Sequence, residues 1–206
     1  MSYSRVLPLI NTDESLIERC RTRDQRAYGE IVDRYKHSVF SYVYRMSGNE
    51  TDAEDLTQEV FIRLFSSLDS FRQQSSLKTW VFRIAGNICI DRYRRQQKHK
   101  AIAFSLDDPI SEFSQTSEST REIADVSYDP AKCLDQSETA GRIQAALSEL
   151  PEKLRSVVVL FDIEGMPYEE IAAVLGCPLG TVKSRLFTAR MHLRKRLKSY
   201  LEPPND

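Results

Sequence analysis

Aromatic, cationic and amide side chains are mixed in one stretch of the sequence, and this mixture suits binding to unpaired bases. Arg83, Asn87 and Arg94 are spaced at i, i+4 and i+11, which places them on roughly one stripe of a helix. Rings such as Phe71 and Trp80 can stack on bases while arginines hold the phosphate backbone. An asparagine amide can pair with the polar edge of one extruded base. Trp80 alone fits a core position better, because large aromatic rings usually bury, so Asn87 is the sharper candidate.

A second group of candidates lies near the C-terminus, in a predicted helix-turn-helix. A short helix through Ile171 and Leu175 is followed by a turn at Gly176 and a second helix from about Leu179. One face of the second helix is an apolar row and predicts a core. The opposite face carries Lys183, Ser184, Phe187, Thr188, Arg190 and Arg194. Cations for phosphates and guanine edges, hydroxyls and a ring for thymine methyl groups are what a recognition helix presents to a major groove.

A third candidate is a short acidic stripe. Asp55, Gln58 and Glu59 stand at i, i+3 and i+4, so two carboxylates and an amide share one side of a helix. Such a stripe can meet a cationic partner. Charged exposed stripes are also what soluble helices normally present to water, so the spacing alone favours the plain solvated face.

These candidates require helices to position them, and the apolar periodicity supplies helices throughout the chain. Seven glycines in 206 residues are few for an all-β protein with many tight turns. Thr51 with Glu54 three residues later predicts a capping box, and Pro151 and Gly165 predict the start and end of another helix. The predicted helices span about 24–46, 51–68, 77–100, 137–150 and 151–165, followed by the helix-turn-helix. The predicted fold is all-α, with two small helical domains.

Charge separates the two predicted domains. Residues 60–100 carry 9 basic and 2 acidic side chains, residues 101–141 carry 2 and 9, and residues 177–206 carry 7 and 2. The serine-rich stretch 101–136 has no sustained period and predicts a flexible acidic linker. Residues 1–100 and 137–206 are then the two domains. Two cationic surfaces beside an acidic one suit a polyanion bound at two places, and solvated helix faces are the simpler alternative.

Several classes of protein are disfavoured. No apolar run reaches the roughly 18 residues of a membrane span, and the N-terminus lacks signal-peptide character, so we expect a cytoplasmic protein without membrane insertion. No catalytic triad, phosphate loop or metal-ligand spacing is evident, so we expect no enzyme activity, cofactor or metal. The four cysteines Cys20, Cys89, Cys133 and Cys177 show no CxxC spacing and are treated as ordinary thiols.

Several motifs together resemble one family. DAEDLTQEVFIRLF, TWVFRIAGNICIDRYRR and LPEKLRSVVVLFDIEGMPYEEIAAVLGCPLGTVKSRLFTAR occur in this order around the linker. The chain thereby resembles an extracytoplasmic-function (ECF, group 4) RNA polymerase sigma factor of the sigma-70 family over about residues 13–100 and 137–200. The resemblance implies a sigma-2-like domain for core polymerase binding and minus-ten recognition and melting, and a sigma-4-like domain for minus-thirty-five recognition.

The resemblance also assigns roles to residues. Asp55, Gln58 and Glu59 match positions that dock on the beta-prime clamp helices of core polymerase. The loop from Phe71 to Leu77 and Asn87 match the pocket that captures a flipped non-template base of the minus-ten element. Together with the residues of the mixed stretch described above, the minus-ten candidates are Phe71, Arg72, Trp80, Arg83, Asn87 and Arg94. The implied minus-thirty-five residues are Lys183, Ser184, Arg185, Phe187, Thr188 and Arg190. The loop RQQSS departs from the Gly-Asp that many relatives carry after the arginine, and Thr188 stands where an arginine is frequent.

The implied partners are core RNA polymerase, promoter DNA as duplex and single strand, and an inhibitory anti-sigma factor. Two alternatives stay open. A self-sufficient helix-turn-helix regulator would bind duplex DNA without polymerase. A nucleic-acid enzyme would need a clustered acidic metal site, which the adjacent but diverging Asp52, Glu54 and Asp55 do not supply.

Overall fold

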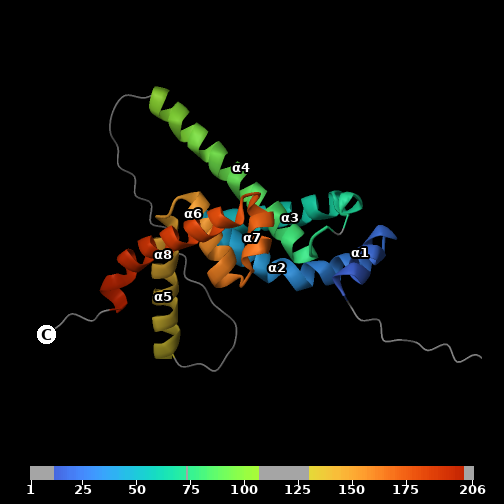
Figure 1. Cartoon of the computed structure of the whole chain (residues 1–206), viewed down its shortest axis with the longest axis horizontal. Coiled ribbons are helices and arrows are strands. Elements are labelled where there is room, and N and C mark those ends of the chain that lie inside the picture. Colours follow the sequence, from blue (N-terminus) through green and yellow to red (C-terminus); the bar gives the residue numbers. More distant parts are fainter. Residues whose placement is uncertain (1–11, 73, 107–129, 202–206) are drawn as a thin grey trace, which may run out of the picture.

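The computed structural model describes residues 12–72, 74–106 and 130–201, and this part of the chain is helical without any strand (Figure 1). The elements in the first lobe are α1 (Asp13–Arg21), α2 (Gln25–Ser47), α3 (Glu50–Ser66), the 3-10 turn η1 (Leu68–Ser70) and α4 (Leu77–Leu106). Those in the second lobe are α5 (Pro130–Ser148), α6 (Glu152–Val158), the π-helical turn η2 (Val159–Ile163), α7 (Tyr168–Leu175) and α8 (Leu179–Leu201). The all-α prediction is confirmed.

Helix starts follow the capping chemistry of the sequence, with one correction. The Asp24 carboxylate accepts from the Arg26 backbone N–H at 2.9 Å and caps α2. The predicted capping box of Thr51 and Glu54 is wrong. Asn49 is the N-cap of α3, because its side-chain oxygen accepts from the Asp52 backbone N–H at 2.9 Å.

In the first lobe α2, α3 and α4 pack against one another around an apolar core. Val39 and Val43 on α2 and Val60 on α3 are fully buried. The rings of Tyr42 and Phe82 meet edge to face with centroids 5.6 Å apart, joining α2 to α4. Val81, Ala85 and Ile88 of α4 are also buried, so the opposite face of this helix is left for polar residues.

In the second lobe α7 and α8 form the predicted helix-turn-helix, and α6 and η2 pack against it. Gly176 ends α7 with φ +59°, a backbone conformation that a residue with a Cβ rarely adopts. The chain then turns directly into α8. Val182, Leu186 and Ala189 of α8 are buried as the apolar row predicts. The opposite side of α8 is therefore fixed outward.

The helices next to the predicted linker are longer than the sequence indicates. α4 continues to Leu106 and α5 begins at Pro130, so both ends of the predicted linker 101–136 are helical. Residues 107–129, the centre of that linker, lie outside the described residues. Figure 1 shows the C-terminal half of α4 projecting from the body of the molecule.

The two lobes pack directly on each other, which the sequence does not predict. Thr79 on α4 donates its hydroxyl to the Glu170 carboxylate on α7 at 2.9 Å. The Lys78 ammonium donates to the Glu164 carbonyl at 3.0 Å. At Gly86 the helices approach closely, since a Cβ there would lie 4.0 Å from Val174 Cγ1 of α7. Buried residues of both lobes form one continuous core.

Candidate nucleic-acid interface

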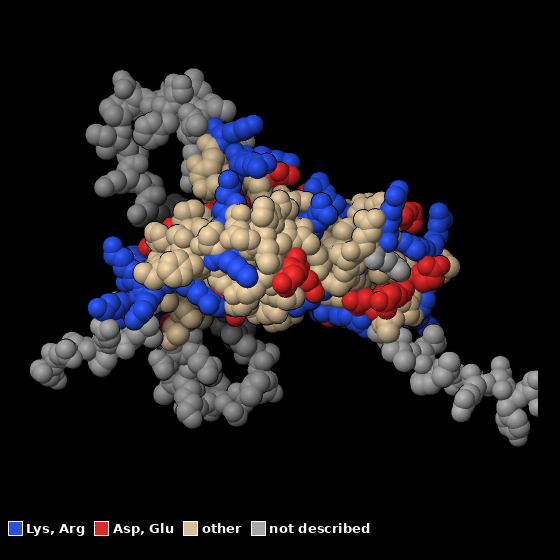
Figure 2. Space-filling view, viewed as in Figure 1, with Lys and Arg blue, Asp and Glu red and all other residues tan. Residues whose placement is uncertain are grey.

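The predicted stripe on α4 is present and faces outward. Arg83, Asn87 and Arg94 are all exposed on the helix that carries Trp80. Within the described part of the chain, none of these three side chains has an ion pair or hydrogen bond. Lys and Arg side chains gather along the projecting half of α4 (Figure 2), where Arg95 is also exposed. A charged, outward helix face of this kind can hold a phosphate backbone.

The two rings near this stripe are placed differently. Phe71 is buried, and its ring stacks on Trp80 with centroids 4.5 Å apart. Arg21 of α1 donates to the Phe71 carbonyl at 2.5 Å, which fixes the start of the loop. Burial makes the Phe71 ring a support for the loop and for Trp80, because its faces are not open to a base. Trp80 is half-buried and Arg72 is exposed.

The exposed face of α8 contains one stripe and a row beside it. Lys183, Phe187, Arg190 and Arg194 follow one another at steps of four, three and four and are exposed. The side chain of Phe187 remains 70% exposed, a large apolar surface on a soluble helix. This stripe can enter a groove as a unit.

The two hydroxyl residues beside the stripe bond to their own helix. Ser184 donates to the Thr181 carbonyl at 3.1 Å, and Thr188 donates to the Ser184 carbonyl at 3.0 Å. Arg185 lies apart, half-buried, and donates to Cys177 Sγ at 3.8 Å. The structure therefore brings Lys183, Phe187 and Arg190 together and turns Arg185 toward the interhelical turn.

Arg190 is held by residues of η2. Its Nε donates to one oxygen of Asp162 at 3.1 Å, and its Nη2 donates to the other oxygen. The guanidinium also lies 5.1 Å from the centroid of the Phe161 ring. Hydrogen bonding to the Asp162 carboxylate raises the pKa of Arg190. Sequence reasoning missed Asp162, because a π-helical turn has no distinctive sequence pattern.

The acidic stripe on α3 is also exposed. Asp55 and Gln58 face solvent, and Glu59 is half-buried beside Arg63, with 3.6 Å between the nearest nitrogen and oxygen. Ile62, three residues beyond Glu59, is 70% exposed and lies on the same side of the helix. The sequence analysis missed this residue. Ile62 therefore adds an exposed apolar side chain to the acidic stripe.

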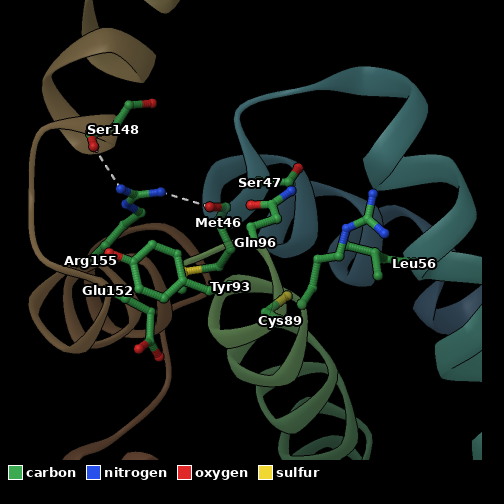
Figure 3. Close-up of a pocket in the computed structure, with 10 residues that line it drawn as sticks. Met46, Ser47, Leu56, Cys89, Tyr93, Gln96, Ser148, Glu152 and Arg155 are labelled. Carbon is green, nitrogen blue, oxygen red and sulfur yellow. Dashed lines mark hydrogen bonds between the residues drawn. The ribbon is translucent and has the colours of Figure 1, made fainter. Parts of the chain in front are cut away.

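A cavity of about 200 Å³ lies where the lobes meet (Figure 3). Arg155 of α6 reaches across it and donates to the Met46 carbonyl of α2 at 2.6 Å and to the Ser148 carbonyl at 2.6 Å. Partial burial lowers the pKa of Arg155. On the α4 side of the cavity, burial raises the pKa of the Cys89 thiol to about 12, so this thiol is protonated at neutral pH.

Other kinds of site find little support in the described residues. No group of three or more His, Cys, Asp or Glu side chains among them is arranged to hold a metal ion. None of the helices in the same ranges combines the length and apolar character needed to cross a membrane.

Comparison with known proteins identifies the family. Two family models match the chain, Sigma-70 region 2 over residues 31–99 and Sigma-70 region 4 over residues 140–193. The ECF RNA polymerase sigma factor SigW of Bacillus subtilis is 36% identical over 182 residues, covering 88% of this chain and 95% of SigW. The chain belongs to the ECF sigma factors. The ECF sigma-E factor of Escherichia coli is also 36% identical, covering 87% of this chain and 91% of its own.

Two solved structures share the fold. CnrH, solved in complex with the cytosolic domain of CnrY, superposes with a TM-score of 0.65 at 26% identity, covering 91% of this sigma factor and 97% of CnrH. RpoE from Bartonella quintana, solved with the anti-sigma factor NepR, superposes with a TM-score of 0.62 at 26% identity, covering 84% of this chain and 97% of RpoE. As an ECF RNA polymerase sigma factor, the chain serves in transcription initiation.

Proposed function

We propose that this ECF sigma factor, of group 4, binds core RNA polymerase and directs it to promoters by reading duplex DNA with α8 and capturing melted bases with α4. The observation that carries the proposal is the pair of exposed cationic stripes, one on each lobe. In this division residues 1–100 serve polymerase and the minus-ten element, residues 137–206 serve the minus-thirty-five element, and 101–136 connect them.

At the minus-ten element the exposed stripe on α4 binds the separated DNA strand. Arg83 and Arg94 hold the backbone of the separated strand, and Asn87 between them pairs with the edge of one flipped base. Arg72 lies at the loop that closes this pocket. Trp80 adds the exposed part of its ring, held in place by Phe71 behind it.

At the minus-thirty-five element the N-terminal half of α8 enters the major groove. Lys183 and Arg190 lie on the exposed stripe, where they contact phosphates and guanine edges, and Phe187 contacts thymine methyl groups. Ser184 and Thr188 flank the stripe. Arg185 contributes by holding the turn through Cys177, because its side chain points away from the stripe.

Core polymerase docks on α3. Asp55, Gln58 and Glu59 meet a cationic helical surface of the polymerase, and the exposed Ile62 supplies apolar contact at the same face. Carboxylates at such an interface speed and orient association, while buried apolar contact supplies much of the affinity.

The packed arrangement of the lobes requires opening for this function. The names of the two promoter elements place them about 25 base pairs apart, roughly 85 Å along a duplex at 3.4 Å per pair. Lobes in direct contact do not span that distance. Core polymerase therefore holds the lobes apart. Once one lobe is bound to its promoter element, the other lobe is at a high effective concentration near its own element, so the two weak contacts together bind more tightly than either alone.

We also propose an inhibitory anti-sigma partner in the cytoplasm. CnrH was solved with CnrY, and RpoE of B. quintana with the anti-sigma factor NepR, and both share this fold. A partner that binds both lobes would stabilise their packed arrangement and so oppose loading onto polymerase.

Reconstituted transcription tests the function. The full chain with core polymerase on fragmented host DNA gives discrete run-off products, whose 5′ ends define the promoters. Tight, selective duplex binding by the chain alone, with no products when polymerase is added, favours the self-sufficient regulator instead.

The α3 assignment gives the first variant. Asp55→Ala with Glu59→Ala reduces co-purification with core polymerase at least tenfold, because both carboxylates of the docking face are lost, and leaves helical content intact by circular dichroism. Glu54→Ala with Asp69→Ala is the charge-matched control, since both residues are exposed. Equal loss in the two double variants contradicts a role for this face.

A further inference from the structure

The ion pair between Asp162 and Arg190 is built with a geometry that recognition of a base can use. Asp162 accepts from both Nε and Nη2 of Arg190, so the carboxylate and guanidinium lie side by side in a two-bond contact. This contact occupies one edge of the guanidinium. No described residue bonds to the edge formed by Nη1 and Nη2, and a bidentate arginine contact to guanine O6 and N7 needs one such edge.

An aromatic ring also contacts the Arg190 guanidinium. Phe161 lies beneath Arg190 at 5.1 Å, and its ring stacks on Tyr168 with centroids 4.7 Å apart and planes 12° apart. Tyr168 lies 5.7 Å below the Lys183 ammonium. The first two cations of the α8 stripe therefore each contact one ring of this stacked pair, and among the described residues only Arg190 of the two also pairs with a carboxylate.

Phe161 and Asp162 both lie in the π-helical turn η2. In η2 the Glu164 backbone N–H donates to the Val159 carbonyl, five residues back, at 3.0 Å. Both Phe161 and Asp162 contact Arg190 of α8. Single-turn π-helical segments of this kind occur frequently at functional sites.

The pair contributes little as a stabilising contact. The side chains of Arg190 and Asp162 are 50% and 34% exposed, and exposed ion pairs add little to folding stability. Its larger effect is on orientation, because a free arginine side chain has many rotamers and contacts any phosphate in reach.

We propose that Asp162 is a positioning residue for promoter specificity. It holds the Arg190 guanidinium in the orientation that contacts a guanine edge and prevents it from contacting a phosphate. This inference rests on the proposed minus-thirty-five reading by α8. Asp162 acts through Arg190 and touches no DNA. Its removal converts one base contact into one backbone contact.

The test uses the holoenzyme, full chain with core polymerase, on a run-off-mapped promoter and on fragments with each minus-thirty-five base pair replaced in turn. The wild type discriminates against loss of one guanine by about 5- to 150-fold. Asp162→Ala reduces that ratio below about twofold at this base pair only. Its logarithmic salt slope becomes steeper by about one, as one more phosphate contact predicts.

Matched variants isolate the mechanism. Glu169→Ala removes one exposed carboxylate of the same lobe and corrects for the change in net charge. In an Arg190→Ala background, Asp162→Ala changes neither the ratio nor the slope beyond that correction. Asp162→Asn retains the side-chain shape but removes the negative charge, and it gives the same loss of preference. It replaces Asp162→Ala in the test if the alanine variant does not fold.

The outcomes separate the two proposals. A wild-type holoenzyme without preference at any minus-thirty-five base pair removes the proposed reading by α8. A clear wild-type preference that Asp162→Ala and Asp162→Asn leave unchanged overturns the positioning role alone. Loss of preference that persists in the Arg190→Ala background also overturns it, because Asp162 would then act through another residue.

Discussion

At the residue scale, exposure distinguishes the residues that can bind from those that support them. Asn87 and Lys183 face solvent as their spacing predicts, because helical periodicity decides which side of a helix is apolar. Phe71 was predicted as a base-stacking ring but is buried. Its burial depends on Arg21, 50 residues earlier, and on Trp80. Contacts between distant segments leave no periodic signal, so the sequence alone could not distinguish the two roles.

Asn87 gives a prediction for promoter melting. Asn87→Ala slows open-complex formation at least fivefold, since the loss of a hydrogen bond to a captured base costs about 1 kcal/mol or more. Closed-complex affinity for duplex DNA stays the same. Permanganate reactivity of unpaired thymines measures opening, and gel shift on unmelted duplex measures the closed complex. Gln25→Ala, an exposed amide at the start of α2, is the control. Equal loss at both stages makes Asn87 a structural residue.

Glu164 gives a prediction for pH. Burial raises its pKa, while a hydrogen bond from Ser41 and the charges of Lys78, His37 and Arg45 act in the opposite direction. A raised folded-state pKa contributes stability at acidic pH that is lost as pH rises through that pKa. Glu164→Gln therefore gains unfolding free energy relative to wild type as the pH rises from acidic to neutral. Urea unfolding at several pH values measures the difference, and a flat difference contradicts the burial effect.

At the element scale, helix type was predictable and helix bounds were not. The periodicity predicts α2, α3, α4 and the helix-turn-helix, because apolar residues at steps of three and four specify a buried stripe. It could not place the start of α3, since Asn49 and Thr51 both have capping side chains. The π-helical turn η2 was likewise missed, and it positions Asp162. A single extra residue in a turn changes side-chain directions without changing composition.

The loop before α4 gives a prediction for stability. Phe71→Ala removes a buried ring under Trp80 and destabilises the chain by about 3–5 kcal/mol. The protein contains one tryptophan, so its fluorescence reports on this contact directly. Chemical unfolding followed by fluorescence measures both effects. Phe71→Leu, which retains most of the apolar volume, loses less. Wild-type stability for Phe71→Ala shows that the ring does not support the loop.

At the scale of the whole molecule, the two lobes share one core. The sequence predicts both lobes and their separation by an acidic stretch, but not their contact. That contact joins residues such as Thr79 and Glu170, 91 positions apart. Each side chain alone resembles an ordinary polar surface residue. Only the fold shows that the Thr79 hydroxyl, 3% exposed, has its acceptor on the other lobe.

The interface between the lobes can be weakened by a single substitution. Glu170→Ala removes the acceptor on α7 for the Thr79 hydroxyl, which retains Ser76 Oγ at 2.8 Å as a partner within its own lobe. Loss of this one hydrogen bond costs about 1 kcal/mol of packing between the lobes. Small-angle scattering of the free chain then shows a larger radius of gyration, and association with core polymerase becomes several-fold faster. Glu169→Ala, its exposed neighbour, changes neither quantity. An unchanged radius for Glu170→Ala shows that apolar contact alone holds the lobes together.

The protonated, 6% exposed thiol of Cys89 makes lobe separation measurable without any introduced label. Glu152 and Arg155 of α6 line the same cavity from the other side, so departure of the second lobe uncovers this sulfur. A mild thiol-modifying reagent then titrates the open population in real time, and the modification rate at this cysteine follows the opening equilibrium. Peptide mapping distinguishes modification of Cys89 from modification of the half-buried Cys177. The rate at Cys177 is the internal reference for the reactivity of the reagent.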